Sequence, residues 1–211
     1  MAKSRDPFFL ALDRIRDRVQ AGGYASGRPI VIVEEARGLG VSTTPVREAL
    51  SWLCGEGLIE RGPSGGFLAV QLDAGAVRDR YGFRLTCLLA GLDLTTGLPT
   101  YGRTPRRDGA PVLELHGLFD GLVRRTGNTA LMDAYDRVGG QLLQLRDAER
   151  RLFADIDAEA DRLLAAASAN GNGDLREALR AYHDRRAGAA AILSLEVARQ
   201  LTTGGAGADH P

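Results

Sequence analysis

The sequence predicts a mainly α-helical protein: an N-terminal winged helix-turn-helix with a two-stranded wing, followed by a C-terminal all-α helical bundle. Three observations support this fold class. Apolar residues recur at helical spacing over most of the 211 residues. Two short strand-like runs flank a glycine-rich turn at residues 62–66, and the strand signal ends at about residue 72. We expect one domain over residues 1–71, a second over 72–202, and a disordered tail over 203–211.

The first element expected is a helix over residues 7–20. Its apolar residues are spaced by four, three and four positions, which places them on one face: Phe8, Leu12, Ile15 and Val19. Gly22 and Gly23 interrupt this pattern. Residues 28–32 are short and β-branched, which indicates a small strand or an extended connector. A short helix should follow over about residues 33–38 and end near Gly38 or Gly40.

The next helix should begin at about Thr44, because Pro45 suits the first turn of a helix and Ser42, Thr43 or Thr44 can cap it. Its apolar positions again follow helical spacing: Val46, Leu50, Leu53, Cys54 and Leu58. Residues 59–61 and 67–70 then read as two strands joined by the turn at 62–66, which predicts a hairpin. The order of elements is that of a winged helix-turn-helix.

Helical patterns occupy the second half of the chain. We expect helices over residues 74–95, 110–126, 128–169 and 174–201, with a break in the third near residues 153–155. Residues 95–108 are rich in Gly, Pro, Thr and Arg and should form a loop. Residues 170–173 should form a helix–helix turn.

Composition limits the classes of function. The formal net charge is zero, which argues against a strongly basic nucleic-acid-binding protein but permits a local basic face. No apolar run is long enough to cross a membrane, and the N-terminus lacks a secretory signal, so we expect a cytoplasmic protein. The histidines, His116, His183 and His210, are scattered, and no nucleophile–base pair or phosphate-binding glycine loop occurs. We therefore expect neither an enzyme nor a cofactor.

One segment carries a specific resemblance. Residues 40–50 read Gly-Val-Ser-Thr-Thr-Pro-Val-Arg-Glu-Ala-Leu and are followed by Glu-Gly-Leu-Ile at 56–59. This pattern closely resembles the GntR family of bacterial regulators, and the similarity extends over residues 8–70. The family typically has an arginine where this chain has Thr43. The resemblance implies a winged helix-turn-helix that binds double-stranded DNA, with weaker phosphate binding or a different operator because one cation is missing.

The candidate DNA-binding residues lie in this segment and in the wing. Ser42 and Thr44 have hydroxyl groups that can bond phosphate oxygens at a helix N-terminus, beside Thr43, although either could simply cap the helix. Arg47 lies one turn further and can reach a guanine edge, although in isolation it would be a solvated surface charge. Gly65 and Gly66 would let the wing backbone approach DNA closely. The cationic contact that Thr43 cannot make could come from Arg5, Arg37 or Arg61, although each of them could simply be an ordinary surface charge.

The second half resembles the FadR-type sensor, or FCD domain, in a shortened and degenerate form. The resemblance rests on Tyr81–Arg84, on Gly127–Leu131, and on spaced residues around Glu159 and Ala178. Many such domains bind a metal through one aspartate and three histidines, but the corresponding positions here are Leu115, Phe119, Ala160 and Arg185. None is a metal ligand, so we expect no metal site.

These replacements leave two alternatives for the second domain: an apolar cavity that binds an effector, or a filled core. In a cavity, Arg84 and the inward-facing Arg185 could anchor an anionic group beside Leu115 and Phe119. Both arginines could instead be ion-paired or exposed.

The sequence therefore predicts a homodimeric repressor that binds a palindromic operator and responds to a small apolar or anionic effector. The alternative is a dimeric DNA-binding or scaffold protein that has no small-molecule ligand and is controlled by a partner.

Overall fold

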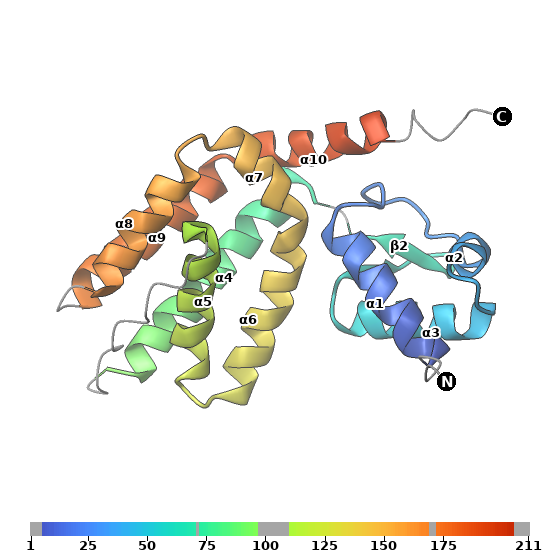
Figure 1. Ribbon diagram of the computed structural model, residues 1–211, viewed down its shortest axis with the longest axis horizontal. Helices are drawn as coiled ribbons and strands as arrows, with labels where there is room; N and C mark the ends of the chain where they lie inside the picture. Colours follow the sequence, from blue (N-terminus) through green and yellow to red (C-terminus); the bar gives the residue numbers. More distant parts are fainter. Residues whose placement is uncertain (1–5, 71, 97–109, 169–171, 205–211) are drawn as a thin grey trace.

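The computed structural model describes residues 6–70, 72–96, 110–168 and 172–204. Figure 1 shows two lobes, an N-terminal one built around a three-helix unit with a hairpin and a C-terminal one built from helices. The mainly α fold class, with its winged helix-turn-helix and helical second domain, is confirmed. Within the described residues, no helix has the length and apolar character needed to cross a membrane.

The N-terminal lobe contains α1 (Pro7–Gln20), α2 (Ile32–Leu39), α3 (Thr43–Gly55), β1 (Ile59–Arg61) and β2 (Phe67–Ala69). The strands pair antiparallel, with Glu60 opposite Leu68. The run at 28–32 is an extended connector: Pro29 forms an isolated bridge with Leu68, and Ile32 already begins α2. The helix at 7–20 and the hairpin are confirmed, and α2 ends at Gly40 in a left-handed conformation with a φ of 67°.

The core of this lobe lies between α1 and α3. The apolar stripe of α1 packs on the inner face of α3, because both helices repeat their buried residues at helical spacing. The fully buried members include Ala11, Ile15, Val46, Ala49, Leu50 and Leu53. This packing leaves the opposite face of α3 in solvent.

The C-terminal lobe contains α4 (Ala74–Leu94), α5 (Pro111–Arg124), α6 (Thr129–Leu142), the 3-10 turn η1 (Leu143–Leu145), α7 (Arg146–Leu152), α8 (Ile156–Ser168), α9 (Asn172–Gly188) and α10 (Ala190–Gly204). The break expected near residues 153–155 separates α7 from α8 and is confirmed. Two further breaks were not predicted. The 3-10 turn η1 interrupts the third stretch, and Ala189 divides the fourth into α9 and α10.

Helix α4 is the central element of this lobe, because it packs against α5, α6, α9 and α10. It crosses α5 closely at Gly91, where a Cβ atom would lie 2.8 Å from the carbonyl oxygen of Leu122. A glycine is therefore required there by backbone contact. The short helix α7 and the beginning of α10 cover one end of the lobe, and α10 extends toward the N-terminal lobe in Figure 1.

Three sequence predictions fall mainly on residues that the structure does not describe. The loop predicted at 95–108 lies outside the described residues beyond residue 96, and so do residues 170 and 171 of the predicted turn. Of the tail predicted at 203–211, residues 203 and 204 belong to α10, because that helix continues to Gly204. Residues 205–211 lie outside the described part of the chain.

Candidate nucleic-acid interface and interior of the second domain

The N-terminal turn of α3 is presented to solvent. Ser42 occupies the N-cap position in an extended conformation, with a ψ of 168°, and its side chain makes no capping hydrogen bond. Ser42, Thr43 and Thr44 are all exposed, whereas Val46 is fully buried and anchors the turn to the core. The first backbone N–H groups and three hydroxyl-bearing residues therefore face the same solvent region, as an anion site at a helix N-terminus requires.

Arg47 lies on the exposed face of α3, one turn after Thr44. No carboxylate of the described residues lies within 4.0 Å of its guanidinium group. Ser51 lies one turn further and donates a hydrogen bond from its hydroxyl to the Arg47 carbonyl oxygen over 2.8 Å. The Arg47 side chain is thus exposed without an ion-pair partner among the described residues, and its five N–H donors are available to a ligand.

Arg61 joins this surface from the hairpin. It stands at the end of β1, where its guanidinium carbon lies 4.4 Å from the centre of the Phe67 ring, and Nη2 donates to the Ser51 hydroxyl over 3.0 Å. Of the three cations considered as replacements for the missing arginine, Arg61 is the one that contacts α3. Arg37 is exposed near the end of α2, and Arg5 lies outside the described residues.

The tip of the wing depends on two glycines. Gly65 and Gly66 have φ angles of 92° and 78°, in the region that side chains with a Cβ rarely adopt. Both are exposed, and a Cβ at either position would meet no atom within 4 Å. The positive φ angles therefore favour glycine at residues 65 and 66, and the open space around them leaves the wing backbone accessible to a ligand.

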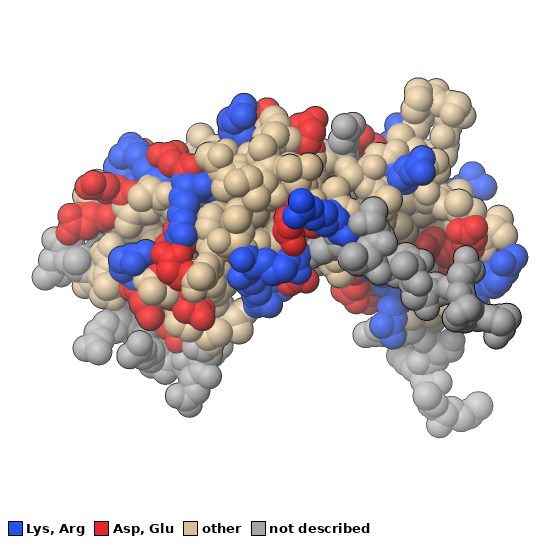
Figure 2. Space-filling view, turned by 90° about the horizontal axis from the view of Figure 1, so that it is seen from above, with Lys and Arg blue, Asp and Glu red and all other residues tan. Residues whose placement is uncertain are grey.

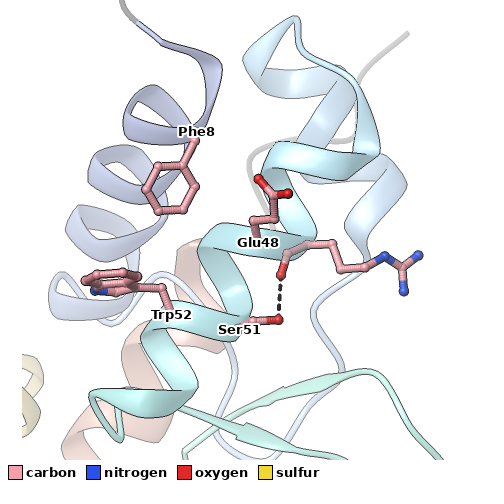
Figure 3. Close-up of a pocket in the computed structure, with 5 residues that line it drawn as sticks. Phe8, Glu48, Ser51 and Trp52 are labelled. Carbon is pink, nitrogen blue, oxygen red and sulfur yellow. Dashed lines mark hydrogen bonds between the residues drawn. The ribbon is translucent and has the colours of Figure 1, made fainter.

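A shallow hollow of about 600 Å³ lies beside the exposed face of α3. Figure 3 shows Phe8 of α1 and Trp52 of α3 on one side of it and Glu48 and Ser51 on the other. The two aromatic rings meet edge to face with centroids 6.1 Å apart, and the Trp52 indole donates to Glu56 Oε1 over 2.8 Å. Sequence reasoning missed Trp52, which is 56% exposed although it belongs to an amphipathic helix.

Charge on the face seen in Figure 2 is mixed. Figure 2 shows Lys and Arg side chains interspersed with Asp and Glu over the face seen from above, without a broad band of one sign. This distribution agrees with the formal net charge of zero. Because the net charge is zero, a long-range basic field contributes little, and DNA affinity depends mainly on local contacts.

In the second domain, the positions expected to line an effector cavity are packed into the core. Leu115 and Phe119 of α5 are each 1% exposed, and they share one apolar cluster with Ala160 of α8 and Tyr182 of α9. The rings of Phe119 and Tyr182 meet edge to face with centroids 5.5 Å apart. Hydrocarbon side chains thus occupy the place where the resembled family has metal ligands.

Arg84 enters this interior from α4 and is only 7% exposed. Its Nε donates to Nε2 of His183 over 3.1 Å, and its guanidinium carbon lies 5.7 Å from the centre of the Phe119 ring. Its Nη2 is buried and has no hydrogen-bond partner, and no carboxylate of the described residues lies within 4.0 Å. Arg84 is therefore a buried cation with donor capacity left unused, which is costly unless an anion satisfies it.

Burial and the charge of Arg84 lower the pKa values of two histidines, His183 and His116. Burial lowers the pKa of His183 well below its usual value, and the positive charge of Arg84 lowers it further. Burial and then Arg84 lower the pKa of His116 as well. Because Nδ1 of His183 lies 2.7 Å from the Leu179 carbonyl oxygen, Nδ1 carries the proton and Nε2 accepts from Arg84.

The expectation that Arg185 faces inward is wrong. Its guanidinium contacts Asp155 at 2.5 Å and Glu159 at 3.1 Å, and its side chain keeps 36% exposure. The inward residue is the next one, Arg186, because one residue corresponds to about 100° of rotation around a helix. Arg185 is thus ion-paired with acidic neighbours, the alternative that the sequence left open.

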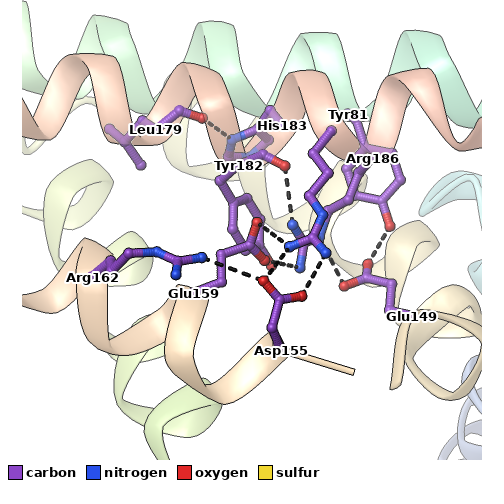
Figure 4. A network of polar contacts seen from close by, with 10 residues as sticks. Tyr81, Glu149, Asp155, Glu159, Arg162, Leu179, Tyr182, His183 and Arg186 are labelled. Carbon is purple, nitrogen blue, oxygen red and sulfur yellow. Dashed lines mark hydrogen bonds and ion pairs between the residues drawn. The ribbon is translucent and has the colours of Figure 1, made fainter. Parts of the chain in front are cut away.

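Arg186 is fully buried at the centre of the polar network in Figure 4. Its Nε donates to Glu149 over 2.9 Å, and its Nη2 lies 2.9 Å from Glu159 Oε2 as an ion pair without hydrogen-bond alignment. Glu149 also accepts a hydrogen bond from the Tyr81 hydroxyl group. Four helices, α4, α7, α8 and α9, are joined through this network.

The residues present do not fit the metal that many FCD domains hold. Leu115, Phe119 and Ala160 offer no donor atom, and Arg185 is a cation. Among the described residues, no group of three or more His, Cys, Asp or Glu side chains converges on a point that could hold a metal ion. His183 uses both ring nitrogens within the protein.

A helix-turn-helix whose second helix exposes its N-terminal turn, followed by a two-stranded hairpin, defines a winged helix-turn-helix, a class of DNA-binding domain. Residues 11–68 match the model of the bacterial regulatory proteins of the gntR family. The N-terminal domain thus belongs to the GntR family, and the chain is a DNA-binding transcriptional regulator. That family consists of transcription regulators and not of enzymes.

The solved structures extend the likeness to both domains. E. coli McbR/YncC is similar to this chain with a TM-score of 0.60 and 17% sequence identity, over 90% of this chain and 98% of that one. Lar, described as controlling the Listeria monocytogenes agr system, gives a TM-score of 0.53 and 13% identity, over 93% and 99%. At these identities the matches establish the fold alone, and the FadR-type assignment of the second domain stays a prediction. No curated protein matches the chain.

Proposed function

We propose that this regulator is a cytoplasmic, homodimeric repressor that binds a palindromic operator. In this proposal Ser42, Thr43 and Thr44 contact phosphates and base edges, and Arg47 donates to a guanine in the major groove. The wing backbone at residues 65–66 lies against the neighbouring groove. The observation that carries the proposal is the exposed first turn of α3, with Arg47 beside it and no carboxylate of the described residues within 4.0 Å.

Footprinting of the DNA upstream of the protein's own operon tests this function. We expect protection of two half-sites related by a two-fold axis. A bidentate arginine–guanine contact contributes about 1–3 kcal/mol, so Arg47→Ala should weaken operator binding by about 5- to 150-fold. Arg78→Ala, at an exposed position of α4, is the matched control and should bind as the wild type does. An unprotected upstream region, or unchanged binding by Arg47→Ala, would contradict the proposal.

We further propose that DNA binding is controlled by a small effector that carries a carboxylate. Arg84 would bind the carboxylate through its unused Nη2, while Leu115 and Phe119 contact the apolar part of the effector. The support is the buried and incompletely satisfied guanidinium group of Arg84, which contacts His183, a residue whose pKa is lowered. We assign the anchor to Arg84 rather than Arg185, because Asp155 and Glu159 already neutralise Arg185.

A thermal-shift screen tests the effector. Acyl-CoA, sugar-acid and amino-acid panels are added to the full chain, and a bound ligand at 100 times its dissociation constant should stabilise the fold by about 2.7 kcal/mol. The same ligand should release operator DNA, and Arg84→Gln should lose the thermal shift. The competing function is a dimeric regulator or scaffold controlled by a partner. The dense packing of Leu115 and Phe119 favours it, and it gains support if no compound raises the melting temperature.

A further inference from the structure

One polar contact between the two domains is a bridging amide. Gln141, in the last turn of α6, donates from Nε2 to the carbonyl oxygen of Gly57 over 2.8 Å. Its Oε1 accepts a hydrogen bond from Nε of Arg80, on α4, over 3.0 Å. Both ends of the amide are therefore engaged, one with the DNA-binding domain and one with the second domain. The side chain is partly buried, so water competes less for these bonds.

Gly57 is well placed to transmit this contact to the DNA-binding surface. It follows the C-cap of α3, has a φ of 72°, and belongs to the turn that joins α3 to β1. A bond to its carbonyl oxygen therefore restrains the recognition helix and the first wing strand together. A Cβ at residue 57 would lie 2.7 Å from Gln141 Nε2, so the amide approaches the turn as closely as glycine permits.

The surrounding contacts confine the junction to the same place. The side chain of Leu58 approaches Gly140, where a Cβ would lie 3.5 Å from Leu58 Cδ2. Helix α1 packs against α6 and η1, which lies just beyond Gln141. Figure 1 shows α6 as the helix of the C-terminal lobe that faces α1 across the junction. The polar bridge lies within this packed junction, so it is one of the contacts that set the angle between the domains.

Arg80 orients the amide and is itself held by charges from both domains. Burial lowers its pKa, and the negative charges of Glu60, Asp73 and Asp79 oppose that shift. Glu60 belongs to β1, whereas Asp73 and Asp79 lie at the start of α4. No carboxylate of the described residues lies within 4.0 Å of Arg80. Its Nε donates to Oε1 of Gln141, and this bond turns Nε2 of the amide toward Gly57.

We propose that Gln141 is a positioning residue that fixes the angle of each DNA-binding domain and thereby sets the half-site spacing that the dimer accepts. The inference rests on the dimeric operator binding proposed above. Helix α3 has 13 residues and is about 20 Å long, so a rotation of about 10° at Gly57 would move its N-terminal turn by about 3.5 Å. That displacement equals about one base-pair rise along DNA. A small change at the bridge therefore changes the preferred spacer by a whole step.

Selection from random-sequence DNA with the full-length protein tests the proposal. Gln141→Glu keeps an acceptor for Arg80 but has no N–H for Gly57, and Gln141→Met removes both bonds at similar size. We expect both variants to select the wild-type half-site bases with a broadened spacer distribution. Affinity for the wild-type spacing should fall about tenfold, while affinity for DNA with one half-site stays unchanged. Arg80→Met should give a smaller effect in the same direction, and Arg78→Met is the matched control.

The possible results distinguish a failure of the positioning role from a failure of the proposed dimeric operator binding. Wild-type protein that selects no paired half-sites would overturn the proposed function, and this inference with it. If the wild-type protein selects a palindrome and both Gln141 variants prefer the same spacer as the wild type, the positioning role alone is overturned. Equal weakening on spaced and single half-sites, together with a lower melting temperature, would show that Gln141 only stabilises the fold and would also overturn it.

Discussion

Replacing Arg186 by methionine should destabilise the C-terminal domain by about 3–5 kcal/mol, because it leaves buried carboxylates without their cation. Arg186 is 0% exposed, and its guanidinium group lies 2.9 Å from Glu149 and 2.9 Å from Glu159. After the substitution Glu159 keeps Arg185 at 3.1 Å, whereas among the described residues Glu149 keeps the hydroxyl group of Tyr81 as its one side-chain hydrogen-bond partner. The main cost therefore comes from Glu149.

Urea unfolding followed by far-ultraviolet circular dichroism measures this cost. With an m-value of about 2 kcal/mol/M, the predicted loss lowers the midpoint by roughly 2 M urea. Trp52 is the single tryptophan and lies in α3, so its fluorescence follows the N-terminal domain. We expect the fluorescence midpoint to move much less than the dichroism midpoint, because the substitution lies in the other lobe.

Two further variants separate the buried charge from general disruption. Arg186→Met combined with Glu149→Gln should recover about 1–2 kcal/mol of the loss, because the orphaned carboxylate is removed. Arg185→Met, whose partly exposed ion pairs are screened by solvent, should shift the midpoint far less. A loss below about 1 kcal/mol for Arg186→Met, or equal losses for Arg185→Met and Arg186→Met, would refute this account of the network.

Three other predictions follow from single contacts. Gly91→Ala should lower the thermal unfolding midpoint, with a cost of about 1–3 kcal/mol, because its Cβ would lie 2.8 Å from the Leu122 carbonyl oxygen; an unchanged midpoint would contradict the close crossing of α4 and α5. The pKa of His183 is lowered in the folded state. As pH falls below about 6.5, the unfolded chain therefore binds a proton at this residue before the folded chain does. The free energy of unfolding should then decline by up to about 1.4 kcal/mol per pH unit. His183→Gln should show a shallower decline in denaturant titrations between pH 7 and 5, and parallel curves would count against a buried neutral histidine. Arg61→Ala should weaken binding to operator and to unrelated DNA by similar factors and reduce the salt dependence, as a phosphate contact would; a loss confined to the operator would instead indicate base readout.

Local sequence determined most of the secondary structure. The spacing of Phe8, Leu12, Ile15 and Val19 predicted α1 within its observed bounds, because one apolar stripe at helical period can be buried only as a helix. Pro45 and the glycines at 65–66 placed α3 and the wing through backbone preferences that act within a few residues. The breaks at η1 and Ala189 escaped prediction. Gly139 and Gly140 precede η1 but lie inside α6, and the single Gly188 precedes Ala189, so these glycines alone do not mark where a helix ends; both breaks arise where helices pack around one end of the lobe.

The candidate DNA-binding surface was predictable for the same reason, since Ser42 through Arg47 lie within two turns of one helix. What sequence could not supply was the set of contacts between distant segments. Arg61 reaches Ser51 only because the hairpin folds back on α3, and Trp52 lies at the edge of the contact between α1 and α3, where its ring meets Phe8 and stays 56% exposed. Arg185 and Arg186 differ by one position and about 100° on α9, and only the packing against α7 and α8 decides which is buried.

The sequence by itself determined the order of elements, the mainly α fold class, and the helix whose first turn faces DNA in the proposed complex, because these depend on short-range periodicity and capping. The tertiary structure alone decided that Arg84 is buried beside His183 with an unused donor, and that Gln141 bridges the domains. Those features join residues that lie 99 and 84 positions apart in the chain. No local pattern specifies such pairs, because the first forms only once α4 packs against α9 and the second only once the two domains meet.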